Sequence, residues 1–224
     1  YLDVVYEYLT YAEPGTLKTI PGLAESWEMS PDGKEWTFHL RQGVQFSGDY
    51  GDMTSADVAY SIERLIRDDS RAGPSSPMRR LIASVETPDD YTVVVKLHFP
   101  DFELAQGYFG AAQQLGIVSR KHFDQLGEAD AEAKPIGTGA YELASITPGS
   151  EIVMTLRDDV ADHWRVQPEF ENIVFKVVPE ESTRVAMLRT GEADIAPIGF
   201  DSIPTVRDAG LTVVSAEATW SPVV

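Results

Sequence analysis

The sequence has 224 residues, no cysteine and a formal net charge of −18. Such a charge argues against a nucleic-acid partner or an anionic membrane surface, because both need clustered lysine and arginine. The lack of cysteine excludes disulfides, thiolate catalysis and cysteine-ligated metals. No apolar run approaches the roughly 20 residues of a membrane-spanning helix, and the length allows one large domain or two modest ones.

The first part of the chain mixes helical and strand patterns. Apolar residues spaced by three and four predict a short helix over residues 1–9. Residues 23–40 predict a β-hairpin, because Ser30-Pro-Asp-Gly33 is a strong turn signal between alternating segments. The stretch Thr54-Ser-Ala-Asp57 has the form of a capping box that begins a helix. One apolar face of that helix is expected to comprise Val58, Ile62, Leu65 and Ile66.

The next segments lead to a glycine-rich junction. A β-branched run predicts a strand over residues 91–99, and residues 100–108 are expected to be helical. Ser119 is predicted to cap a short helix that ends at Gly127. An acidic, alanine-rich segment without large apolar residues then precedes residues 134–143, which contain Pro-Ile-Gly-Thr-Gly.

The junction at residues 134–143 is interpreted as a structural turn. Its proline and two glycines are expected to adopt backbone conformations closed to other residues, so that the chain turns sharply. A phosphate-binding loop would need a third glycine where Glu142 stands, and a helix where a strand is predicted.

Short strands and helices are predicted after the junction. Residues 141–146 and 151–156 should form a second hairpin around Pro148-Gly-Ser150. The remaining predicted elements are a strand at 173–178, a helix at 181–190 ending at Gly191, a strand at 194–196, a helix at 202–209 and a strand at 211–215.

No catalytic or metal-binding motif is present. The four histidines are far apart in the sequence, and none has the spacing of a paired metal site. Neither a Gly-x-Ser-x-Gly elbow nor a Gly-Lys-Ser/Thr loop occurs. Nothing in these motifs demands an enzyme. Aromatic side chains that could line a cleft are Tyr6, Tyr8, Trp27, Trp36, Trp164, Phe200 and Trp220.

Three stretches carry a resemblance to a known family. The first comprises Val5-Tyr-Glu-Tyr-Leu9, PGLAESWEMSPDGKEWTFHLRQGVQF from Pro21 and TSADVAYSI from Thr54. The second is Pro135-Ile-Gly-Thr-Gly-Ala-Tyr141, and the third is FKVVPEESTRVAMLRTGEADI from Phe175. Together they resemble the extracytoplasmic solute-binding proteins of ABC importers, in the peptide and nickel family known as family 5. The resemblance covers essentially the whole chain, in order.

The resemblance implies an α/β lobe with mixed sheets, of the type II (cluster C) periplasmic-binding-protein kind. It assigns residues 17–135 to an inserted subdomain, and residues 1–16 and 136–224 to the main domain of the first lobe. Members are about twice as long as this chain, so the second lobe and the first strand are expected to lie outside it. The chain both begins and ends abruptly, within apolar segments.

Three departures from the family pattern stand out. Tyr8 replaces the glycine of Tyr-Glu-Gly-Leu, and residues 48–53 replace a usual Asp-Gly-x-Pro. Both could reshape the wall of a binding pocket. An Asn-Pro-x-Tyr-Trp element is reduced to residues 158–164, which keep only Trp164, and this third departure is expected to be peripheral.

The function that the resemblance implies is capture of a small solute by closure of two lobes, followed by delivery to the transmembrane permease subunits. The expected solute is a dipeptide or oligopeptide, and no cofactor is expected. The protein is expected to act in the periplasm. Any membrane attachment would lie in the transporter or in a lipid anchor outside this chain. The predicted ligand-binding residues are Trp220, Thr219, Phe200, Ser75, Met78 and Gln114.

Two alternatives stay open. The same fold could serve as the ligand-sensing domain of a transcriptional or signalling regulator. The solute could also be a nickel chelate, a sugar or an opine. The absence of cysteine and of paired histidines argues against direct metal ligation by this lobe.

Overall fold

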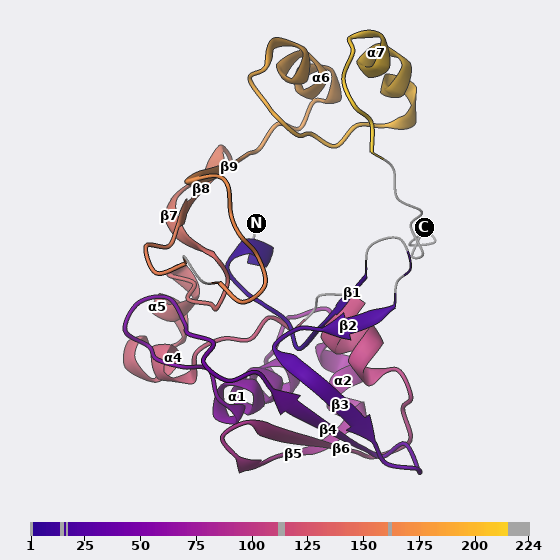
Figure 1. Ribbon diagram of the computed structural model, residues 1–224, viewed down its shortest axis with the longest axis vertical. Coiled ribbons are helices and arrows are strands. Elements are labelled where there is room, and N and C mark those ends of the chain that lie inside the picture. Colours follow the sequence, from indigo (N-terminus) through magenta and orange to yellow (C-terminus); the bar gives the residue numbers. More distant parts are fainter. Residues whose placement is uncertain (1, 14–15, 17, 112–114, 161–162, 215–224) are drawn as a thin grey trace. The chain divides into compact units, whose positions relative to one another are not determined.

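A computed structural model describes residues 2–13, 16, 18–111, 115–160 and 163–214 (Figure 1). The chain divides into two units, which are described separately below. The first unit contains residues 1–145 and 153–173, and the second contains residues 146–152 and 174–224.

An antiparallel sheet of four strands forms the centre of the first unit. In spatial order the strands are β3 (Ala24–Met29), β4 (Glu35–Leu40), β6 (Thr92–Leu97) and β5 (Ile82–Asp89). The hairpin predicted over residues 23–40 is confirmed as β3 and β4, and Gly33 takes a positive φ of 68° in the turn between them. The predicted strand at 91–99 is confirmed as β6. Strand β5 was not predicted, because mostly exposed side chains give it no alternating apolar pattern.

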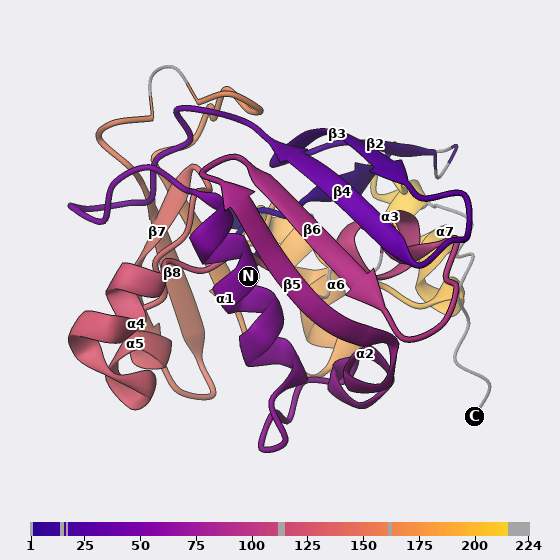
Figure 2. The same ribbon diagram turned by 90° about the horizontal axis from the view of Figure 1, so that it is seen from below.

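Helix α1 (Ser55–Ile66) covers the sheet and begins as its capping motif predicts. The Asp57 carboxylate accepts a hydrogen bond from the backbone N–H of Thr54 at 2.9 Å. Its other oxygen accepts one from the backbone N–H of Arg120 at 2.9 Å, so the same carboxylate also holds the start of α4 (Arg120–Leu126). The helix contacts β5, β6 and α2 (Ser75–Leu81) (Figure 2).

The apolar core of this unit lies between the sheet and the helices. Val58 and Ile62 of α1 are fully buried, as are Phe38, Val93 and Val95 of the sheet. Burial of each such side chain contributes about 1.5–3 kcal/mol to stability. The aromatic side chains extend this core, since Phe38 contacts Phe109 at 5.5 Å between ring centroids.

The N-terminal segment is extended rather than helical, so the helix predicted over residues 1–9 is wrong. Only Leu2–Val4 form a 3-10 turn, and β1 (Thr10–Ala12) then pairs with β2 (Thr19–Pro21). Val5 and Leu9 are nonetheless buried, at 1% and 0% exposed. A spacing of four also fits one side of an extended segment, and the successive burial of Glu7, Tyr8 and Leu9 shows that this segment is buried on both sides.

The glycines of the junction allow two backbone segments to lie in close contact, and they do not form a sharp turn. Neither Gly137 nor Gly139 has a positive φ, so the expectation of unusual backbone conformations is wrong. A Cβ atom at Gly137 would lie 2.0 Å from the carbonyl oxygen of Val5, and one at Gly139 would lie 2.3 Å from that of Val4. Gly139 N–H donates to the Val5 carbonyl oxygen at 2.8 Å. The returning chain thus lies directly against the N-terminal segment.

Short helices complete the first unit. Residues 100–108, predicted to be helical, contain α3 (Leu104–Gln106), which continues as a π-helical turn over Gly107–Ala111. Helix α4 ends before Gly127, and the hydroxyl of Ser119 caps it by accepting from the His122 N–H at 3.3 Å, as predicted. The acidic segment before the junction is helix α5 (Glu128–Ala133), in which only Ala131 is buried.

A second sheet has the strand order β7-β8-β9. Its strands are β7 (Tyr141–Thr147), β8 (Glu151–Leu156) and β9 (Asn172–Lys176). The hairpin predicted over residues 141–156 is confirmed, and Gly149 takes a positive φ of 73° in its turn.

The second unit contains α6 (Glu181–Thr190), a 3-10 turn at Phe200–Ser202 and α7 (Ile203–Asp208). Both helices were predicted, and Gly191 ends α6 in the left-handed conformation, with φ 73°. The strands predicted at 194–196 and 211–215 are absent from the described residues, which end at 214. Ile195 and Val214 are 92% and 88% exposed, so neither segment has a strand to pair with in the described part of the unit.

None of the helices in the described ranges has the length and apolarity that crossing a membrane requires.

We predict that Gly137→Ala destabilises the protein by about 3 kcal/mol, because a new methyl group would overlap the Val5 carbonyl. The measurement is the free energy of unfolding in urea. Gly107→Ala is the matched control, since a Cβ there meets nothing within 4 Å and φ is −77°. That variant should change stability by less than about 1 kcal/mol. Equal effects of the two substitutions would contradict the close-approach explanation.

Candidate functional site

A buried carboxylate joins three segments of the first unit. Glu7 is 0% exposed, and its Oε2 accepts hydrogen bonds from Thr138 Oγ1 and Trp164 Nε1, both at 2.9 Å. Its Oε1 accepts from Arg165 Nε at 2.8 Å. A carboxylate without water is stable only when paired and hydrogen-bonded, and Glu7 has both kinds of partner. We call Glu7, Thr138, Trp164 and Arg165 the Glu7 cluster.

Aromatic rings and guanidinium groups surround the Glu7 cluster. The Arg41 guanidinium lies 4.4 Å from the centre of the Trp164 ring, and that of Arg165 lies 4.6 Å from the centre of the Tyr11 ring. Burial, together with the nearby Glu7 charge, raises the pKa of Tyr11. Burial and a hydrogen bond to Asp3 raise the pKa of Tyr8. Both phenols therefore stay neutral across physiological pH.

Trp164, from the element that was expected to be peripheral, belongs to the Glu7 cluster. Trp164, the one residue kept from the shortened element at 158–164, donates directly to Glu7. The interpretation of this element as peripheral is therefore wrong. The error arose because sequence spacing cannot show that residues 7 and 164 meet.

A small crevice of about 220 Å³ lies beside the Glu7 cluster and is lined in part by Thr138, Arg157 and Trp164. Arg157 is only 6% exposed and donates to the Gly139 carbonyl at 3.0 Å and to both carboxylate oxygens of Asp159, at 2.9 and 2.8 Å. This hydrogen bonding lowers the pKa of Asp159. Because its donors are used by protein acceptors, Arg157 connects the segments around the crevice and is not a free group for a ligand.

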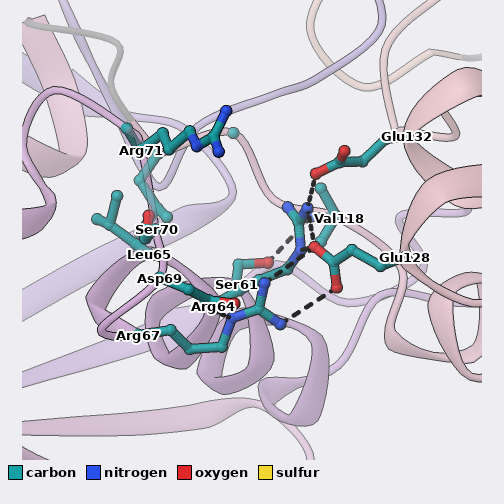
Figure 3. Close-up of a pocket in the computed structure, with 13 residues that line it drawn as sticks. Ser61, Arg64, Leu65, Arg67, Asp69, Ser70, Arg71, Val118, Glu128 and Glu132 are labelled. Carbon is teal, nitrogen blue, oxygen red and sulfur yellow. Dashed lines mark hydrogen bonds and ion pairs between the residues drawn. The ribbon is translucent and has the colours of Figure 1, made fainter.

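A larger pocket of about 540 Å³ lies beside α1 (Figure 3). Helix α1 contributes Ser61, Arg64 and Leu65, and the following loop contributes residues 67–72 except Asp68. Residues 115–118 and α5 supply the remaining wall. The volume falls in the range of about 300–1,000 Å³ that is typical of sites for small ligands.

Ion pairs between α1 and α5 form one wall of this pocket. Arg64 donates to Glu128 through Nε and Nη2 at 2.8 and 2.5 Å, and its Nη2 also contacts Glu132 at 2.5 Å. Arg67 forms a two-pronged pair with Glu128 at 3.1 and 3.0 Å. Hydrogen bonds from Arg67, and then from Arg64, lower the pKa of Glu128 despite partial burial. This one carboxylate therefore joins α5 to the end of α1, about 60 residues earlier in the sequence.

Arg71 stands on the opposite side of the pocket from Glu128 and Glu132 (Figure 3). Its side chain is exposed, and no hydrogen bond or ion pair links it to any residue that the structure describes. Among the residues that the structure describes, the pocket therefore combines an ion-paired wall with one arginine, Arg71, that has no partner.

The comparisons with known proteins establish the family of this chain. The sequence model of the "Bacterial extracellular solute-binding proteins, family 5 Middle" matches residues 18–223. The chain belongs to this family. It is 32% identical to "Di/tripeptide-binding protein 1" of Pseudomonas aeruginosa, over 95% of the chain and 43% of that relative. The chain thus spans less than half the length of this relative.

Solved structures of similar proteins share the fold of this family 5 chain. The "periplasmic binding protein DppA" of Helicobacter pylori, in complex with the peptide STSA, superposes with a TM-score of 0.77 at 27% identity, covering 92% of this chain and 43% of that one. The PBP AgaA of A. tumefaciens R10, in complex with agropinic acid, gives 0.74 at 31% identity, covering 85% and 37%. The predicted fold, a mixed α/β lobe of the type II periplasmic-binding-protein kind, is confirmed.

Three of the six predicted ligand-binding residues lie within the part of this family 5 chain that the structure describes. Met78 is 0% exposed within the core, and the buried Ser75 donates its hydroxyl to the Ser70 carbonyl at 3.2 Å. Phe200 belongs to the second unit and is 89% exposed. Gln114, Thr219 and Trp220 lie outside the described residues. Binding of ligand by these six residues stays a prediction.

The charged pocket was missed, although the sequence holds a signal for it. Arg64, Arg67 and Arg71 recur at spacings of three and four in an otherwise acidic chain. Such a stripe on a helix and its extension favours a common face. Across the ranges that the structure describes, no group of three histidine, aspartate or glutamate side chains could hold a metal ion.

We predict that Glu7→Ala lowers the free energy of unfolding by about 3 kcal/mol, because it leaves Arg165 and two buried donors without their acceptor. Urea unfolding measures the change. Glu28→Ala is the control, since the Glu28 side chain is 74% exposed and its one contact, with His39, is 3.9 Å long. That control should stay within about 0.5 kcal/mol of the parent. A comparable loss in both variants would show that Glu7 has no special role.

We also predict a pH dependence that originates at Glu128. Its pKa is lower in the folded state than the ordinary value of 4.5, so its pairing stabilises the fold above pH 4.5 and is lost as the pH falls through the folded pKa. Glu128→Gln should therefore lose less stability than the parent when the pH is lowered below 4.5. Urea unfolding as a function of pH measures this, and parallel curves would refute it.

Proposed function

We propose that this chain is part of the substrate-binding component of an ABC importer, which captures a dipeptide or oligopeptide outside the cytoplasm and delivers it to the membrane permease. The observation that carries this proposal is membership of family 5 over residues 18–223. The relative named "Di/tripeptide-binding protein 1" and the neighbour solved with the peptide STSA support peptide as the ligand class.

The fold suits this role because a lobe of this kind offers one preformed wall to a ligand. In a two-lobed protein, a ligand that contacts both lobes stabilises the closed arrangement by its difference in affinity between the open and closed states. A micromolar dissociation constant corresponds to about −8 kcal/mol, which the two lobes would share. The rigid α1–α5 wall of the pocket supplies such a preorganised surface.

The assignment of domains and cell compartment forms part of this proposal. We assign residues 17–135 to the inserted subdomain, which is supported because β3, β4, β5 and β6 all fall within this range. Residues 1–16 and 136–224 would belong to the main domain. The whole protein would act in the periplasm as a binding protein without catalytic activity. Its partners would be its peptide ligand and the transmembrane subunits of the importer.

A non-peptide solute is the second candidate. It is favoured by the likeness to the PBP AgaA in complex with agropinic acid, at 31% identity and a TM-score of 0.74. Dipeptides and such a ligand both carry a carboxylate, so similar lobes could serve both classes.

Native mass spectrometry of the protein at its full natural length, purified without denaturation, tests the proposal. We expect a retained mass that matches short peptides, and its disappearance after unfolding and refolding. The refolded protein should then show a higher melting temperature when a dipeptide mixture is added, because a ligand that binds only the folded state stabilises it. A ligand-free spectrum, combined with an unchanged melting temperature, would refute peptide capture. A retained opine would support the second candidate.

A further inference from the structure

We propose that the pocket between α1 and α5 binds the carboxylate group of the captured ligand, with Arg71 as its anchor. The inference rests on the proposed function and adds to it the place and the chemistry of one contact. The pairing of each charged group around the pocket decides this contact, because only a group without a protein partner can offer its full charge to a ligand.

The glutamates and two of the arginines are already engaged. Both oxygens of Glu128 accept hydrogen bonds, from Arg64 and Arg67, so this carboxylate is saturated. Arg64 uses Nε and Nη2 on Glu128 and Glu132, and its guanidinium stacks 4.3 Å from the centre of the Phe123 ring. These contacts hold the Arg64 side chain in place and leave its Nη1 as a donor that no described residue uses.

Arg71, unlike Arg64 and Arg67, is not paired with any carboxylate of the described residues. It lines the same pocket, and its guanidinium has no acceptor in the described part of the chain. Figure 3 shows its side chain extended on the side opposite the paired wall. A guanidinium presents its donors in a planar fork that matches a carboxylate, so a carboxylate is the ligand group that this geometry favours.

The electrostatic surroundings restrict the class of ligand further. The residues that line the pocket include three arginines, Arg64, Arg67 and Arg71, and three carboxylates, Asp69, Glu128 and Glu132, so their formal charges balance. A multiply charged anion would meet these carboxylates at close range and be repelled. A single carboxylate on an otherwise neutral or zwitterionic molecule, such as a short peptide, meets the free arginine without that penalty.

The pocket is complete within one unit of this chain. All of the described residues that line it fall within residues 1–145, so the proposed contact is formed inside the first unit. Its volume of about 540 Å³ accommodates the end of a short peptide. Arg71 therefore selects ligands by their carboxylate, whichever groups bind the remainder of the molecule.

The test compares trialanine with trialanine amide in the full-length protein, by isothermal titration calorimetry at low salt. The two probes differ only in the charge at the C-terminus. We expect the parent to bind trialanine more tightly than the amide, and Arg71→Gln to weaken trialanine binding by about tenfold while leaving the amide unchanged. The preference for the free carboxylate should thus disappear in the variant.

Arg80→Gln is the matched control. Arg80 is also exposed, has no partner among the described residues and does not line the pocket, so this variant removes the same charge. It should retain the parent's preference. Parent-like binding of both probes by Arg71→Gln would overturn the inference and leave peptide capture intact. An equal loss in both variants would also overturn it, as a general effect of charge. If the parent binds neither probe, both peptide capture and the inference fail.

Discussion

The first unit depends on the neutralisation of one buried charge. Glu7 has no access to water, so its carboxylate must receive all of its hydrogen bonds from the protein. Those donors come from residues 131 to 158 positions further along the chain. The contact therefore fixes where the chain returns after the four-stranded sheet, and the approach of Gly137 and Gly139 to the N-terminal backbone follows from it. The N-terminal segment consequently has to be extended, since its carbonyls serve as acceptors.

Local signals in the sequence predicted local structure well. The Pro-Asp-Gly turn predicted β3 and β4, and the capping motif at Thr54 and Asp57 predicted α1, because both depend on atoms only a few residues apart. The helix over residues 1–9 failed because a spacing of four also fits an extended segment buried on two sides. The strands at 194–196 and 211–215 failed because a strand needs a partner, which a local pattern cannot supply.

The candidate site was less accessible to sequence reasoning than the fold. The family resemblance identified the type of lobe, but the charged pocket combines α1, the loop after it, residues 115–118 and α5, and only the folded chain brings them together. The acidic segment at 128–133 looked like a featureless connection, whereas Glu128 closes the wall of the pocket. Catalytic and metal-binding motifs differ in this respect, because they have fixed spacings that can be searched for in the sequence alone.

Helix α5 has an unusual mode of attachment. It buries only Ala131, so apolar contact contributes little to holding it, and its link to α1 consists mainly of the pairs that Glu128 and Glu132 make with arginines. Exposed ion pairs weaken as dissolved ions accumulate, with a screening length of about 8 Å at physiological ionic strength. The ion pairs that hold α5 against α1 would therefore be stronger at low ionic strength and weaker at high ionic strength. The strength of the attachment between α5 and α1 would thus vary with ionic strength without any change in sequence.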